Sequence, residues 1–380
     1  MLTAIGVISL LAWGYLVFLH HDFWKGNQRL AATERLADWP SVAAIIPARN
    51  EAESITASIS SLMDQDYPGR FRILVADDSS TDGTAGLAHA AGDERRRIEV
   101  VSAPPLEAGW TGKLWALNHG LNTVSTDQPP DFIWFTDADI VHDPSVLSQL
   151  VSKAINDEHD LVSLMVQLHC RSFWERLLVP AFVFFFAMLY PFPAINDPLS
   201  RVAGAAGGCI LIKRTTLRQI GGIAAIKDEL IDDCALAAAV KQAGGRIWLG
   251  LADTSRSIRR TSGLGDLWQM VTRTAFTQLR YSAIFLAGTV AGLSVVFLAP
   301  PLLFLSLPLH NSAIAGSAGG VAWFLMAGTY IPTLKEYSQL LVSALFLPLA
   351  ATLYAAMTLH SALNHWRGAS SRWKDRDYAR

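Results

Sequence analysis

The stretch that most constrains the fold is residues 132–139. Its first five residues have the apolar composition of a buried β-strand, and two carboxylates, Asp137 and Asp139, follow directly. Open α/β sheets bind ligands beyond the carboxyl ends of their strands, so a ligand site is expected here. A divalent cation held by one or two carboxylates commonly takes its other ligands from substrate phosphates. Two interpretations follow: a cation site for a diphosphate, or an exposed acid pair before a helix starting near Pro144.

The region from Ser41 to about Leu251 alternates strand-like and helical patterns. This alternation predicts an α/β fold with a parallel, doubly wound sheet. Strands are expected at 42–46, 71–76, 98–101 and 132–136, and helices at 113–124 and around Ile55, Ile59 and Leu62.

Polar clusters follow successive strands of this region and are expected at one edge of the sheet. Carboxylates suit hydrogen bonds to a nucleotide base or ribose, and a lysine at a helix start suits an anion. Each cluster also has a structural interpretation, since Asp82 or Thr81 is expected to cap a helix. The clusters contain Pro47, Arg49 and Glu51 after the first strand, Asp77 and Asp78 after the second, and Gly112-Lys113 at a helix start.

The overall composition indicates a membrane protein. The chain is 51% hydrophobic and only 17% charged, which is too apolar for an ordinary soluble enzyme of this size. A net charge of -2 and the lack of a basic, aromatic stripe argue against nucleic-acid binding. The three cysteines have no metal-ligand spacing and are odd in number, so neither a zinc site nor a disulfide framework is expected.

Four apolar runs are candidate membrane spans: an N-terminal anchor within 1–21, and Ala283 to about Leu309, Ala313 to Ile331 and Leu340 to Leu363 within a 283–363 bundle. Pro300-Pro301 is expected to break the second run. The basic residues Lys25, Arg29 and Arg35 place the following 41–255 domain on the cytoplasmic side. Four spans would put the basic tail, 364–380 with Lys374 and Arg380, on the outer side, so either one run is re-entrant or the count differs by one.

Two further segments are predicted at the membrane surface. Residues 177–192 are apolar and aromatic, contain Pro180, and are expected to lie in the interface beside a lipid acceptor. Residues 262–282 have the pattern of an amphipathic interface helix and include Arg273 and Arg280.

The ordered motifs resemble family 2 glycosyltransferases of the GT-A fold over roughly 41–281. They are Pro-x-x-Asn-Glu at 47–51, Asp-Asp-x-Ser-x-Asp-Gly-Thr at 77–84, Gly-Lys-x-x-Ala-Leu-Asn at 112–118 and Asp-x-Asp at 137–139. The resemblance implies a nucleotide-sugar donor and Mg²⁺ or Mn²⁺. It implies that Asp77 or Asp78 contacts the nucleotide base and that Asp137 contacts the sugar or the ribose. It also implies that Asp139 binds the metal, with Asp137 as a second candidate ligand. The expected donor-binding residues are completed by Pro47, Arg49, Glu51, Lys113, Arg273 and Arg280.

The second half of the domain extends the resemblance. The glycine-rich segment with Gly207, Gly208 and Cys209 resembles the part that lines the acceptor in this family, although close packing explains it equally well. Asp232 and Asp233 stand where the family carries Glu-Asp at a helix start, so Asp233 is the expected general base of an inverting transfer. The alternative is an acidic first turn that the helix dipole stabilises.

The Gln-x-x-Arg-Trp motif of processive synthases is missing around 267–281. Pro-Ala-Arg-Asn-Glu, Ala-Gly-Trp-Thr-Gly-Lys-Leu-Trp-Ala and Thr-Ala-Phe-Thr-Gln-Leu-Arg-Tyr are instead similar to hopanoid-biosynthesis-associated glycosyltransferases and, more remotely, ceramide glucosyltransferases. The expected function is transfer of one sugar to a lipid at the cytoplasmic membrane. The alternatives are a processive polysaccharide synthase and a non-catalytic nucleotide-binding membrane scaffold.

Overall fold

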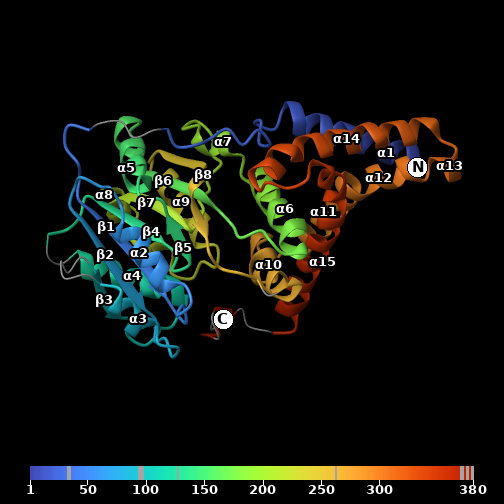
Figure 1. The fold of residues 1–380 in the computed structure, drawn as a ribbon. Coiled ribbons are helices and arrows are strands. Elements are labelled where there is room, and N and C mark those ends of the chain that lie inside the picture. Colours follow the sequence, from blue (N-terminus) through green and yellow to red (C-terminus); the bar gives the residue numbers. More distant parts are fainter. Residues whose placement is uncertain are drawn as a thin grey trace. The chain divides into compact units, whose positions relative to one another are not determined.

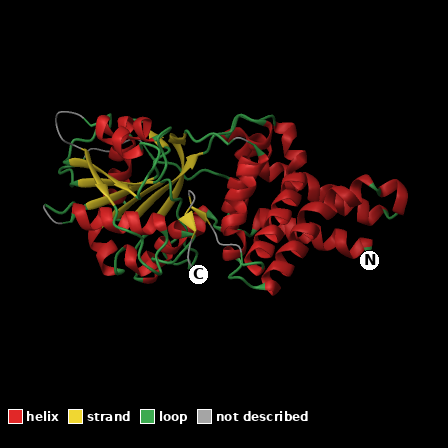
Figure 2. Cartoon of the chain, turned by 90° about the horizontal axis from the view of Figure 1, so that it is seen from below, coloured by secondary structure: helices red, strands yellow, loops and turns green. Residues whose placement is uncertain are grey.

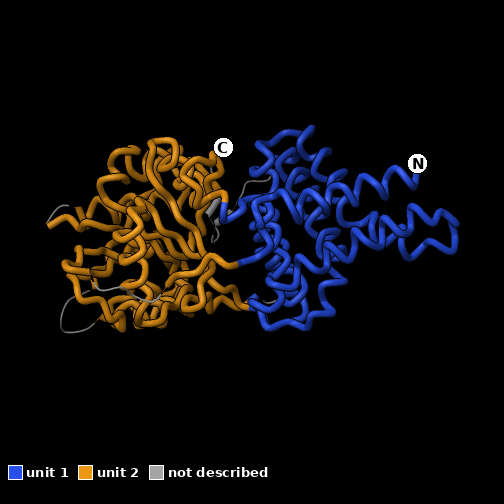
Figure 3. The backbone as a smooth tube through the Cα atoms, turned by 90° about the horizontal axis from the view of Figure 1, so that it is seen from above, with its two compact units in different colours: residues 1–26, 170–193, 261–369 blue, residues 27–169, 194–260, 370–380 orange. Residues whose placement is uncertain are grey.

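The computed structural model describes residues 1–31, 36–92, 98–125, 128–261, 263–368, 372–373 and 376–377. The chain forms two compact units, coloured separately in Figure 3. Unit 1 comprises Met1–Gly26, Cys170–Pro193 and Thr261–Ala369, and unit 2 comprises Asn27–His169, Ala194–Arg260 and Ser370–Arg380. The predicted basic residues Arg35, Lys374 and Arg380 lie outside the described residues.

Unit 2 contains a Rossmann-like α/β domain built on an eight-stranded sheet of order β3-β2-β1-β4-β7-β6-β8-β5. Figure 1 labels its elements, and Figure 2 shows helices on both sides of the strands. The strands are β1 (Val42–Ala48), β2 (Phe71–Asp77), β3 (Ile98–Ser102), β4 (Phe132–Thr136), β5 (Ile140–His142), β6 (Leu161–Gln167), β7 (Cys209–Lys213) and β8 (Ile247–Ser257). The helices are α2 (Ile55–Met63), α3 (Thr84–Ala90), α4 (Gly112–Val124), α5 (Val146–Asn156), α8 (Arg214–Gln219), η1 (Ile223–Ile226) and α9 (Asp232–Gln242), while α7 (Phe192–Asn196) begins in unit 1. A two-stranded pair, β9 (Arg372–Trp373) and β10 (Arg376–Asp377), completes unit 2.

The central strands are apolar on both faces because helices cover both faces of the sheet. All seven residues of β1 and all five of β4 are buried, and Trp134 in β4 is fully buried. The expected strand at 132–136 is confirmed, and the three other expected strands extend one or two residues further toward the site.

The predicted α/β fold is confirmed, but the sheet is mixed rather than parallel throughout. Strands β1 to β4 pair in parallel, but β7 is antiparallel to both β4 and β6, and β5 is antiparallel to β8. Because β7 runs against β4, its first residue, Cys209, pairs with the last residue of β4, Thr136. This reversal brings the glycines that precede β7 to the carboxyl edge of the sheet, where Asp137 lies.

Unit 1 is helical. Its elements are α1 (Leu2–Phe18), α6 (Phe173–Leu189), α10 (Leu264–Gln278), α11 (Ala283–Leu293), the π-helix η2 (Ser294–Leu298), α12 (Ala299–Leu305), α13 (Leu307–His310), α14 (Ala313–Glu336), η3 (Leu341–Phe346) and α15 (Leu347–Trp366). Among the described residues, three helical segments are long and apolar enough to cross a membrane: Ala283–Leu305, Ala313–Glu336 and Leu341–Trp366. The segment predicted as an anchor within 1–21 forms the apolar helix α1 of 17 residues, which is shorter than these three segments, and its role as an anchor stays a prediction.

The expected break at Pro300-Pro301 is wrong, because the helix continues through both prolines. The prolines remove the N–H groups that would bond Val296 O in either an α or a π pattern. The indole Nε1 of Trp13 in α1 donates to this carbonyl at 2.8 Å, and the Trp13 ring packs edge-on against Phe297. A π-helix directly before the prolines and a side-chain donor from α1 therefore keep the helix intact.

The aromatic segment 177–192 forms most of α6, which continues through Pro180. Phe184 is 1% exposed and packs edge-on against Phe23 and Tyr330, within unit 1. Its side chain therefore belongs to the interior of the helical unit, and the interfacial position expected for the segment 177–192 stays a prediction.

Candidate active site

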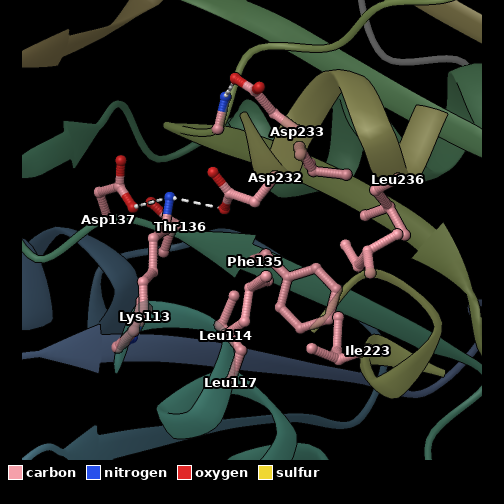
Figure 4. A pocket seen from close by; sticks show the side chains of 14 residues that line it. Lys113, Leu114, Leu117, Phe135, Thr136, Asp137, Ile223, Asp232, Asp233 and Leu236 are labelled. Atoms are coloured by element: carbon pink, nitrogen blue, oxygen red, sulfur yellow. Dashed lines mark hydrogen bonds and ion pairs between the residues drawn. The ribbon is translucent and has the colours of Figure 1, made fainter. Parts of the chain in front are cut away.

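The polar clusters of the sequence converge at the carboxyl edge of β1, β2 and β4. The pocket in Figure 4 is lined on one side by apolar residues of α4, η1 and α9 and on the other by charged residues. Its charged residues are Lys113, Asp137, Asp232 and Asp233. These four residues come from three separate segments of the chain, all within unit 2.

Lys113 links two of these segments. Its Nζ lies 3.1 Å from Asp137 Oδ1 and 3.1 Å from Asp232 Oδ2, shown as dashed lines in Figure 4. Burial opposes the charged amine, but the carboxylates of Asp137, Asp232 and Asp233 outweigh it and raise the Lys113 pKa. Lys113 is therefore a permanent cation among three acids.

Asp233 lies in the first turn of α9, with both carboxylate oxygens held by backbone donors. Gly207 N donates to Oδ2 at 2.9 Å, and Cys234 N donates to Oδ1 at 2.7 Å. Burial and the neighbouring Asp232 charge raise the pKa of Asp233 to about 6, while Lys113 and the two N–H groups act in the opposite direction. Asp233 is thus a fixed, partly buried carboxylate with a pKa in the range suited to a general base.

Gly207 lies where a Cβ atom would be in close contact with this cluster. A Cβ at this position would come within 3.2 Å of Lys113 Nζ and 3.4 Å of Asp233 Oδ2. A Cβ at Gly208 would come within 2.9 Å of Val166 Cγ2, so this glycine serves close packing. Cys209 is fully buried, and its thiol accepts a hydrogen bond from Trp134 Nε1, so its side chain belongs to the core and only Gly207 and Gly208 remain as acceptor-side candidates.

The two carboxylates of the Asp-x-Asp motif have different partners. Asp137 contacts Lys113, whereas Asp139 Oδ2 accepts a hydrogen bond from Arg259 Nε at 2.7 Å and another from Ser257 Oγ at 3.2 Å. The same guanidinium donates through Nη2 to Glu51 Oε1 at 2.5 Å. Asp139, Arg259 and Glu51 therefore form a continuous ion-pair chain.

Sequence reasoning missed Arg259. It lies just beyond β8, and β8 reaches the site because it pairs antiparallel with β5, the strand that directly follows Asp139. Arg256, Arg259 and Arg260 follow one another closely with no distinguishing motif. Only this long-range strand pairing identifies which arginine meets Asp139.

Hydrogen bonds join the loop after β1 to the loop after β2. Asn50 N donates to Ser80 Oγ, and Thr81 N donates to Asn50 Oδ1, both at 3.0 Å. Asp82 accepts from Thr84 N and Ala52 N, also at 3.0 Å each. Asp82 thus binds the first backbone N–H of α3, as expected of a capping side chain, although the N-cap position itself is Gly83. The hydrogen bonds between Asn50, Ser80 and Thr81 join the two motifs.

The acids at the end of β2 are deeply buried. Arg49 Nη1 donates to Asp78 O at 2.5 Å and lies 3.5 Å from Asp78 Oδ2. Asp77 is 4% exposed, and its Oδ2 accepts from Ser80 N at 3.1 Å. Its other oxygen, Oδ1, is buried without a hydrogen-bond partner among the described residues. A buried acceptor of this kind is suited to a donor group from a ligand.

Arg273 and Arg280 belong to unit 1. Arg273 is part of α10, and Arg280 directly follows this helix in the left-handed region, with φ 52°. Their donor contacts stay predictions.

The carboxylates of Asp137 and Asp139 fit a divalent cation in chemistry and charge. Oxygen donors of this type suit Mg²⁺ and Mn²⁺. Burial raises the pKa of Asp137, and the negative charges of Asp139 and Asp232 add to this shift, whereas Lys113 opposes it. A further positive charge would relieve this repulsion. No group of three or more His, Cys, Asp or Glu side chains within the described ranges could hold a metal by itself, so further ligands would come from the substrate.

The chain is similar to known glycosyltransferases. Residues 43–221 match the family model of glycosyl transferase family 2. A probable glycosyltransferase, YdaM, of Bacillus subtilis is 31% identical over 33% of this chain and 29% of its own length. An N-acetylglucosaminyltransferase of Rhizobium leguminosarum bv. viciae is 29% identical over 40% of this chain and 35% of its own length. The chain thus matches about a third of each curated relative.

A solved structure shares the architecture over nearly the whole chain. The mannosyltransferase PcManGT of Pyrobaculum calidifontis, solved with GDP-Man and Mn²⁺, aligns with 99% of this chain and 100% of its own at a TM-score of 0.57 and 18% identity. This likeness establishes the fold: a Rossmann-like GT-A domain with apolar helices.

Proposed function

We propose that this chain, whose residues 43–221 match glycosyl transferase family 2, is a membrane glycosyltransferase. It transfers one sugar from a nucleotide-diphosphate sugar to a lipid acceptor, with inversion at the anomeric carbon. It acts at the cytoplasmic membrane as a multi-pass protein with unit 2 in the cytosol. The sequence resemblance favours a hopanoid as the lipid.

The observation that carries this proposal is the contact of Lys113 with Asp137 and Asp232, one residue before Asp233. The lysine holds the turn after β4, where a diphosphate and its cation would bind, beside the start of α9, where the candidate base lies. A protein that only bound the nucleotide would need the acids after β4, but it would not need the candidate base at the start of α9. The gathering of both in one pocket favours an enzyme.

Several residues provide a donor site. Asp77 Oδ1 is a buried acceptor suited to an N–H of the nucleotide base, and Arg49 holds Asp78 beside it. Pro47 and Glu51 line the same edge of the sheet, and Asp137 and Asp139 would hold a divalent cation. A bound Mg²⁺ or Mn²⁺ would neutralise charge on the diphosphate leaving group. The GDP-Man and Mn²⁺ in the similarly folded mannosyltransferase support this arrangement.

Asp233 is the base of the reaction. Its carboxylate takes the proton of the acceptor hydroxyl while the hydroxyl oxygen forms a bond to the anomeric carbon. The bond from that carbon to the diphosphate oxygen breaks, and the electron pair leaves with the nucleoside diphosphate. Gly207 N and Cys234 N hold the carboxylate in place for this transfer.

The apolar surface of unit 1 supports a lipid acceptor and a membrane location. Three helical segments there have the length and composition of membrane spans. They expose large apolar side chains, which a soluble protein would have little reason to carry in such number. These include Ile284, Phe285, Leu302, Leu305, Ile314 and Phe324.

The rate of transfer is expected to depend on pH through Asp233. Only the deprotonated carboxylate accepts a proton, and its pKa is raised to about 6. We therefore expect kcat/KM to be level at pH 7 to 8 and to fall about tenfold for each pH unit well below the pKa of the base. Asp232→Asn should shift the midpoint to lower pH because the Asp232 charge raises the pKa. A flat wild-type profile from pH 5 to 8 would exclude Asp233 as the titrating base.

Release of nucleoside diphosphate tests the function. The full-length protein in detergent is incubated with individual nucleotide sugars, with and without a bacterial lipid extract. We expect one donor to give nucleoside diphosphate only when lipid is present. Extracts with and without hopanoids distinguish this acceptor from other lipids. No release with any donor and lipid would favour the binding scaffold, and long polymer would favour the processive synthase.

A further inference from the structure

Arg259 is held between two acids that the donor site uses. Its Nε donates to Asp139 Oδ2 and its Nη2 to Glu51 Oε1. The side chains of Asp139 and Glu51 are each only 12% exposed, whereas that of Arg259 is 44% exposed. The guanidinium therefore closes the solvent side of two largely buried carboxylates.

The bond to Asp139 occupies one of the two carboxylate oxygens that a metal ion could take. Asp139 Oδ2 accepts from both Arg259 Nε and Ser257 Oγ. A divalent cation bound to the same oxygen would repel the permanently charged guanidinium, so both cannot hold it at full strength. Glu51 offers Arg259 a second anchor, and solvent lies on its open side.

We propose that Arg259 is a positioning residue that competes with the divalent cation for Asp139 and leaves this carboxylate when the cation binds. This inference rests on the proposed function, because it takes the cation to be the partner of a nucleoside diphosphate. The guanidinium stays attached to Glu51 after release. Asp139 is thereby kept ordered and neutralised until the cation arrives.

The release of Arg259 also couples binding of the cation to binding of the donor. A freed guanidinium lacks its second carboxylate, and a diphosphate is the oxyanion that an arginine fork binds best. A nucleoside diphosphate would therefore offset the loss of the Asp139 contact. The cation and the nucleotide should bind with positive cooperativity, and the cation should bind more weakly without nucleotide.

The test measures Mn²⁺ binding to the full-length protein without donor or acceptor, by calorimetry and by the electron paramagnetic resonance signal of free Mn²⁺. Arg259→Ala removes the competing charge, so we expect Mn²⁺ to bind about tenfold more tightly than to the wild type, the order expected on losing one charge-assisted bond. Arg259→Lys keeps a charge but loses the planar fork, and should lie between the two. Addition of GDP, UDP or pyrophosphate should tighten Mn²⁺ binding to the wild type more than to Arg259→Ala.

Arg256→Ala is the matched control. Arg256 lies in β8, three residues before Arg259; its Nη1 is 3.7 Å from Asp143 Oδ1, and its side chain is 61% exposed. Its loss removes one positive charge of equal size without touching Asp139, so Mn²⁺ affinity should stay within about twofold of the wild type, as expected for a screened surface charge. Thermal unfolding of each variant without Mn²⁺ establishes that the binding change does not reflect misfolding.

The outcomes separate this inference from the proposed function. Tighter Mn²⁺ binding in folded Arg259→Ala, with Arg256→Ala unchanged, supports the competition. Equal or weaker Mn²⁺ binding in folded Arg259→Ala overturns it, while a wild type that still binds Mn²⁺ leaves the proposed cation intact. Absence of Mn²⁺ binding in the wild type and in every variant, with and without nucleotide, overturns both.

Discussion

Replacing Asp233 with asparagine is expected to reduce sugar transfer by about 100-fold to 10,000-fold, the usual contribution of a general base. Asparagine is nearly isosteric with aspartate and its carbonyl oxygen still accepts one of the two backbone N–H bonds, from Gly207 or Cys234. It cannot take a proton from the acceptor hydroxyl. Because the base acts in the transition state, donor affinity should stay nearly unchanged.

The measurement is kcat for transfer beside the Kd of the donor, on wild type, Asp233→Asn and Asp232→Asn. Asp232 has its own contact, to Lys113, and serves as the matched acid in the same turn. Asp232→Asn should retain more activity than Asp233→Asn. A normal rate in Asp233→Asn would reduce this residue to a helix-start acid and make Asp232 the next candidate for the base.

Replacing Asp139 with alanine is expected to reduce the rate of transfer by at least about 100-fold. This is the usual effect of losing one preorganised electrostatic contact in the transition state. The change removes the second carboxylate of the Asp-x-Asp pair and leaves Arg259 with Glu51 alone. Wild-type activity should disappear in excess chelator and return on addition of Mg²⁺ or Mn²⁺. Transfer rates with and without chelator check this directly.

Ser257→Ala is the control for Asp139→Ala. Ser257 donates to the same carboxylate at 3.2 Å but carries no charge, so its loss should have a much smaller effect on the rate. Undiminished wild-type turnover in excess chelator would contradict the cation requirement. In that case positively charged side chains such as Arg259 and Lys113 would be expected to bind the diphosphate.

Local patterns in the sequence predicted the parts of the fold that depend on local physics. The strand at 132–136 is recognisable because all of its residues are buried, and buried strands read as continuous apolar runs. Asp82 was expected to cap because its side chain reaches N–H groups a few residues away. Most acids of the candidate site directly follow predicted strands, so the sequence alone places them at one edge of the sheet.

What could not be predicted depends on partners far apart in the chain. The direction of β7 follows from its pairing with β4, some seventy residues earlier, and no local pattern encodes it. Arg259 meets Asp139 only through the pairing of β8 with β5. The intact helix at Pro300 needs the indole of Trp13, and Phe184 is buried by rings from two other segments. In each case the deciding contact comes from a distant part of the chain.

The most direct test of the central claim is the structure of the product formed in the nucleoside diphosphate assay. Mass spectrometry should find one sugar per lipid, with one nucleoside diphosphate released for each glycolipid. Proton NMR should show an anomeric configuration opposite to that of the donor, because Asp233 activates the acceptor for a single displacement. A retained configuration, or release of free sugar with no glycolipid, would contradict the account.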